Sequence, residues 1–143
     1  VWAAPSGGGG AWGSITGTLS AQTDLQAALD VKAPLGVITQ NSQSTAYTLV
    51  LADAGKHILH PSADTTARTF TIPANSSVAF PVGTVVSFVN QNAAGVVTIA
   101  ITTDTMRLAG AGTTGSRTLA ANGTATALKI TSTQWIISGV GLT

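Results

Sequence analysis

Two histidines three positions apart, His57 and His60, are the side chains in this sequence best suited to bind a metal ion. They lie in a short run with strand character, where side chains three positions apart point to opposite faces. One ion would therefore not readily take both, and a zinc site would need Asp53 or Asp64 as a further ligand. We expect polar strand-end histidines and no metal site. The alternative is an ion held by one histidine from each of several chains.

Carboxylates are the next candidates, because a pair of them can hydrolyse a glycosidic bond. The sequence has five acidic residues, all aspartates, and Asp53, Asp64 and Asp104 lie in its C-terminal part. Each follows a strand-like run and precedes small or hydroxyl residues, which is typical of turns. Aromatic residues, which stack on sugars, make up only 5% of the chain. We therefore expect no enzymatic activity.

Three arginines, Arg68, Arg107 and Arg117, are the candidates for ligand binding, with acidic sugars or a carboxylate at a subunit boundary as the ligand. The alternative is that they are ordinary exposed strand residues. The glycine-rich run 109–116 has no following lysine or helix, so it does not predict a phosphate site. We expect no cofactor.

Composition limits the classes of function. Charged residues make up 8% of the 143 residues and the net charge is +1, so no basic stripe is available for nucleic acid. No run of about 18 apolar residues predicts a membrane span, and the first residues do not resemble a secretion signal. A β-rich surface with so little charge favours association, so we expect self-assembly.

The elements divide the sequence into two parts. Residues 1–34 contain a flexible glycine run, Gly7–Gly10, and a short helix that begins near the capping residue Thr23. The helix is too short to be stable alone. Its apolar residues Leu25 and Leu29 must be covered, either by the chain's own domain or by identical helices on a symmetry axis.

Residues 35–143 are predicted to form a β domain, because apolar residues alternate and turn residues recur every 8–12 positions. The last hairpin should place Leu128, Ile130, Trp135 and Ile137 in the core, and 91–95 should be a hairpin loop. The fold expected is an antiparallel sandwich or jelly-roll-like barrel. The predicted strands are 47–51, 57–60, 68–72, 84–90, 96–101, 106–108, 124–130 and 134–138.

The segment WGSITGTLSAQTDLQAALDVKAP, residues 12–34, resembles a segment of bacteriophage fibre and virion appendage proteins. The residues that carry the match are Trp12, Gly13, Ile15, Gly17, Leu19, Gln22, Asp24, Leu25 and Leu29. The resemblance implies a homotrimer made in the bacterial cytoplasm and carried on the virion surface. Its N-terminal segment would dock to other virion proteins, and its β domain would face outward.

The resemblance leads to two hypotheses. In the first, the chain is a trimeric fibre or knob that contacts a host polysaccharide or receptor through loops 52–56, 91–95 and 109–117. In the second, it is a head fibre or capsid-decoration protein without a receptor role. The residues expected to make particle or trimer contacts are Trp2, Trp12, Ile15, Leu19, Leu25 and Leu29.

Overall fold

The computed structural model describes residues 36–91 and 94–143, and Ile38–Thr143 form one compact unit. The predicted helix and all six predicted docking residues lie outside the described residues. Within them the protein is mainly β, as predicted, with one short 3-10 helix, η2 (Leu51–Asp53). The strands are β1 (Gln40–Ser42), β2 (Tyr47–Thr48), β3 (His57–His60), β4 (Arg68–Ile72), β5 (Val85–Asn90), β6 (Val97–Ile101), β7 (Thr105–Leu108), β8 (Arg117–Thr131) and β9 (Gln134–Leu142).

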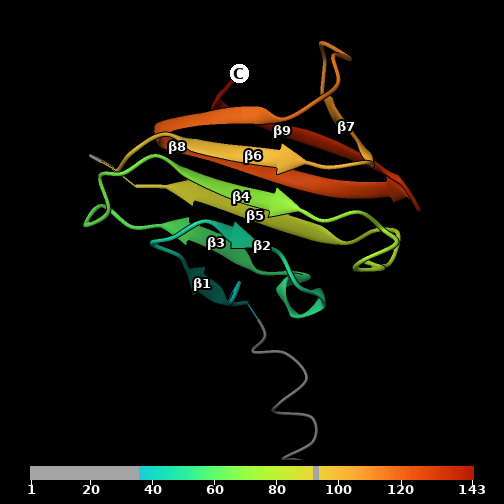
Figure 1. Ribbon diagram of the computed structural model, residues 1–143, viewed down its shortest axis with the longest axis horizontal. Helices are drawn as coiled ribbons and strands as arrows, with labels where there is room; N and C mark the ends of the chain where they lie inside the picture. The colour runs from blue at the N-terminus through green and yellow to red at the C-terminus, as the bar shows by residue number, and fades with distance from the viewer. Residues whose placement is uncertain (1–35, 92–93) are drawn as a thin grey trace, which may run out of the picture. The chain divides into compact units, whose positions relative to one another are not determined.

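The nine strands form one curled, mixed sheet with two wings (Figure 1). Wing A is β1, β3 and β5, and wing B is β2, β4 and β6. Strands within a wing pair in parallel, because successive strands along the chain alternate between the wings. The expected all-antiparallel arrangement is therefore wrong. The spacing of turn residues is the same for a hairpin and for a connection that crosses to the other wing.

The loop 91–95 illustrates this correction. It was expected to join an antiparallel hairpin, yet β5 and β6 do not pair with each other. β5 pairs with β3 and β8, whereas β6 pairs with β4 and β8. Figure 1 shows β5 and β6 in different wings of the sheet.

The long strand β8 joins the two wings. Its residues 117–119 pair with β6 and its residues 124–128 pair with β5, both antiparallel. Between these parts the register shifts, and Asn122 adopts a left-handed conformation with φ of 62°. The Asn122-Gly123 pair, whose residue types are typical of tight turns, lies instead inside one strand at this register shift. The predicted hairpin between β8 and β9 is confirmed.

One apolar core lies between the wings, because inward-facing residues of both belong to the same buried cluster. Val86 and Phe88 of β5 lie opposite Ala127 and Ala125 of β8, so large side chains meet small ones. The cluster consists of Leu49, Ile58, Phe70, Ile72, Phe80, Val86, Phe88, Val97, Ile99, Met106, Leu119, Ala125, Ala127, Trp135 and Ile137.

The inward face of β8 differs from the prediction. Trp135 and Ile137 are buried as expected, but Leu128 and Ile130 are 36% and 40% exposed. Lys129 between them is 1% exposed. Ala125, Ala127 and Lys129 share the inward face because the small residues are the ones that fit opposite β5.

Candidate functional site

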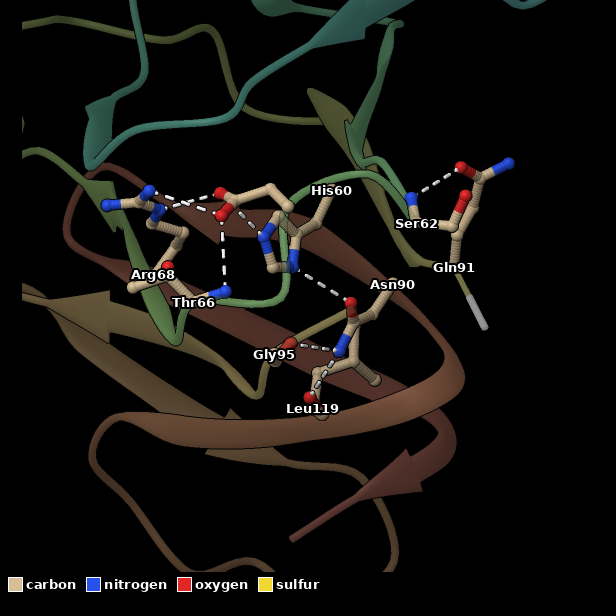
Figure 2. Close-up of polar contacts among 9 residues, drawn as sticks. His60, Ser62, Thr66, Arg68, Asn90, Gln91, Gly95 and Leu119 are labelled. Carbon is tan, nitrogen blue, oxygen red and sulfur yellow. Dashed lines mark hydrogen bonds and ion pairs between the residues drawn. The ribbon is translucent and has the colours of Figure 1, made fainter. Parts of the chain in front are cut away.

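A buried polar network lies at the edge where β3 and β5 end and β4 begins (Figure 2). His60 is completely buried, and its ring meets Phe70 edge-on at 6.1 Å. Its Nδ1 lies 3.0 Å from Asn90 Oδ1, and its Nε2 lies 3.1 Å from Asp64 Oδ2. The network thus links β3, β5 and the 61–67 connection.

Asn90 sets the orientation of this network. Its amide nitrogen donates to the carbonyl oxygens of Gly95 at 3.0 Å and Leu119 at 3.1 Å. The amide oxygen is therefore the atom that faces His60, where it accepts. Because Asp64 also accepts, both hydrogen bonds to the His60 ring form only when both ring nitrogens carry hydrogen.

Asp64 is the acceptor at the centre of the network. Arg68 donates to it from Nε at 2.7 Å and from Nη2 at 3.2 Å, and the Thr66 backbone N–H donates to it at 3.1 Å. The Arg68 guanidinium is the main cause that holds the pKa of Asp64 well below its usual range, and it outweighs partial burial, which acts in the opposite direction. The same pair raises the pKa of Arg68.

The other two candidate arginines, Arg107 and Arg117, hold the glycine-rich loop 109–116. Arg107 donates to the Gly112 carbonyl at 3.0 Å, and Arg117 donates to the Thr113 carbonyl and, at 3.1 Å, to its hydroxyl oxygen. Strand β6 lies between the strands that carry Arg117 and Arg68. The three arginines therefore do not form one binding site, and each has acceptors within its own chain.

The two histidines of β3 have different surroundings. His57 contacts Gln40 at 3.3 Å, away from the His60 network. Residues 36–91 and 94–143 contain no cluster of three or more metal-binding side chains. They also contain no helix of the length and apolar character needed to cross a membrane.

Asp53 and Asp104 have structural partners. Asp53, 1% exposed, accepts from Asn41 at 2.9 Å, from the Tyr47 hydroxyl at 2.7 Å and from the Val50 backbone at 2.9 Å. Burial, helped by the bond to Asp53, raises the pKa of Tyr47. Asp104 accepts from the Asn75 backbone at 3.1 Å. All three aspartates lie outside the strands, Asp53 in the 3-10 helix η2 and Asp64 and Asp104 in connections.

A second buried polar group surrounds Lys129, which sequence reasoning missed. Its Nζ donates to Asn75 Oδ1 at 2.6 Å and lies 5.6 Å from the centre of the Trp135 ring. The sequence signal that could have identified it is the spacing of two residues between Ala125, Ala127 and Lys129, which places all three on the inward face of one strand.

The third feature is an apolar row on the outward face of the adjacent strands β5, β8 and β9, made by Val85, Leu128 and Ile136. Val85 and Leu128 are 40% and 36% exposed. The neighbouring row on the same face is polar: His57, Ser87, Thr126 and Ser138. The apolar row exposes hydrophobic side chains to solvent, whereas the side chains of the polar row can form hydrogen bonds with water.

The predicted receptor loops lie at different edges. Loop 52–56 precedes β3, and loop 109–117 precedes β8 where β6 ends, so both lie at the edge where wing A strands begin. Gln91 and Gly95, at the two ends of loop 91–95, lie at the opposite edge, beside the His60 network. The three loops do not form one continuous surface.

Comparison with known proteins finds no similar family model, no similar curated protein and no similar solved structure.

Proposed function

We propose that this protein is a structural component of a bacteriophage particle, a homotrimeric fibre or knob exposed on the virion. Its N-terminal segment attaches to other virion proteins. The β domain acts as a two-layered, sandwich-like knob that contacts the host surface. The proposal assigns it no catalytic role.

The observation that carries the proposal is the apolar row of Val85, Leu128 and Ile136 on the outward face of β5, β8 and β9. The chain has few charged residues, so electrostatic repulsion between copies of the chain is weak. The row would be buried if a second chain packed against it, either through its own copy of the row or through another face. The resemblance of residues 12–34 to phage appendage proteins supports three copies and the particle as the place of assembly.

Arg68, Arg107 and Arg117 donate hydrogen bonds to acceptors in their own chain. This supports a knob in which each copy binds its ligand weakly and several copies bind together. Three equivalent loops on one trimer add avidity without a deep pocket. Loops 52–56 and 109–117, which share an edge, are the surfaces we assign to contact with a host polysaccharide or receptor.

The test compares the association state of the full chain with that of two variants by sedimentation velocity. Leu128→Thr removes apolar area from the row, whereas Thr126→Ser changes the neighbouring polar row on the same strand. We expect a trimer for the parent and for Thr126→Ser, and dissociation at low concentration for Leu128→Thr. If the parent and both variants associated equally, the row would not be part of the interface between chains.

The second candidate function is a head fibre or capsid-decoration protein without a receptor role. The lack of a common surface for the three predicted receptor loops favours it. Antibody labelling of intact particles separates the two. Label on the head at many symmetry-related positions supports decoration, and label at the tail tip supports the host-contacting knob.

A further inference from the structure

Lys129 is a lysine buried on the inward face of β8. The strand exposes Leu128 and Ile130 on either side and turns Lys129 inward, where it is 1% exposed. Lysine is almost never fully buried unless it is paired. Within residues 36–91 and 94–143 the only ion pairs are those of Asp64, so no carboxylate in this part of the chain neutralises Lys129.

The contacts of Lys129 are those of an amine placed against an amide. Nζ lies 2.6 Å from Asn75 Oδ1. A carbonyl bond is about 1.2 Å long, so the Asn75 carbonyl carbon lies no more than about 3.8 Å from Nζ. That limit is close to the separation of about 3–3.5 Å at which bond formation begins.

Aromatic rings close this group on one side. The Trp135 ring lies 5.6 Å from Nζ, and Phe80 packs edge-on against Trp135 at 5.7 Å. The backbone of Lys129 is fixed as well, because it exchanges hydrogen bonds with the 83–84 segment. The amine is thus held in one position.

We propose that Lys129 and Asn75 join in an intramolecular amide bond. Once Lys129 Nζ has given up a proton, it attacks the side-chain carbonyl carbon of Asn75, and a bond forms between Nζ and Cγ. The bond from Cγ to Nδ2 then breaks. The amide nitrogen leaves as ammonia with a proton taken from the amine, so no oxidant, reductant or other reactant is needed. The product is uncharged and suits the buried position better than an ammonium ion.

Asp104 is the group assigned to move the proton. It is 9% exposed, and its Oδ2 accepts from the Asn75 backbone N–H at 3.1 Å. Because this carboxylate is hydrogen-bonded to the backbone of one of the two reacting residues, we assign it the transfer of the proton from the amine to the leaving nitrogen. Asp104 acts on the reaction of two other side chains and remains unchanged.

The bond would tie the 73–84 connection to β8, two segments far apart in the sequence. This inference does not depend on the proposed function, because it concerns only contacts inside one chain.

The experiment is mass spectrometry of the full chain, intact and after trypsin digestion. The intact chain is expected to weigh less than its sequence by one molecule of ammonia. Trypsin would leave Lys129 uncut, and residues 69–107 would remain attached to residues 118–143. A chain of full sequence mass, cut after Lys129, overturns the proposal even if no variant is made.

Variants identify the atoms that react. K129R and N75A should have their full sequence mass, and K56R, the matched control, should still lose ammonia. N75D should lose water instead, because its leaving group is hydroxide. Loss of ammonia that persists in K129R would come from another asparagine, such as Asn122 before Gly123, and would overturn the proposal. D104N should leave most chains uncrosslinked, and complete reaction in D104N would remove Asp104 from the mechanism.

Discussion

Replacement of Asn90 by alanine is the most informative change in the buried polar network. Asn90 is 1% exposed and makes three hydrogen bonds, with His60, Gly95 and Leu119. Each such bond contributes about 1 kcal/mol to stability. The alanine variant leaves their partners without Asn90, so we expect the free energy of unfolding to fall by about 3 kcal/mol.

The assay is urea unfolding at one fixed protein concentration, because association would make stability depend on concentration. Gln91→Ala is the matched control: Gln91 is the next residue, is exposed, and accepts one hydrogen bond from Ser62 at 2.9 Å. Its effect should stay within about 0.5 kcal/mol. If N90A were no less stable than Q91A, the hydrogen bonds of Asn90 would not stabilise the domain.

Three further outcomes are expected. Arg68 lowers the pKa of Asp64 below its ordinary value of 3.8. The pair therefore stabilises the fold above that pH, and this contribution is lost as the pH falls through the lower pKa of the folded state. D64N should flatten the acid limb of a plot of unfolding free energy against pH, and an unchanged limb would contradict this. G139A should destabilise the domain by roughly 1–3 kcal/mol, because an added Cβ would meet the Thr124 carbonyl oxygen and, at 2.7 Å, the Ala125 Cα; thermal unfolding at the parent's midpoint would refute the close approach. R107A should increase proteolytic cleavage within 109–116, since Arg107 donates to Gly112, and a cleavage rate equal to the parent's would show that the contact does not hold the loop.

The positions of several strands could be read from the sequence because alternation is local, whereas β1 and residues 117–123 of β8 were not predicted, and the predicted strand 47–51 ends at Thr48. The predicted strands 57–60 and 68–72 match β3 and β4, and 84–90 and 96–101 differ from β5 and β6 by one residue. Strand pairing is not local. A five-residue loop rich in Asn, Ala and Gly serves equally well for a hairpin and for the crossing between wings that 91–95 makes, so the antiparallel prediction failed.

The inward face of β8 was misjudged for a different reason. The run 124–130 alternates in both phases, with Ala125 and Ala127 in one and Leu128 and Ile130 in the other. The larger side chains favoured the wrong phase. Phe88 and Val86 on β5 leave room only for alanine opposite them, a constraint that a single strand does not display.

The candidate sites show the same limit. His60, Asp64 and Arg68 were each noticed as separate residues, but the network depends on Asn90, which lies 30 positions from His60. Lys129 and Asn75 are 54 positions apart. Such partners are brought together by the alternation of strands between wings, which only the structure reveals.

The central proposal, a trimeric appendage, is tested most directly by the native mass of the unmodified full chain, measured by light scattering on a gel-filtration column. The chain weighs 14.2 kDa. We expect a single species with the mass of three chains. A single species with the mass of one chain, at concentrations well above those on a particle surface, would contradict the proposal.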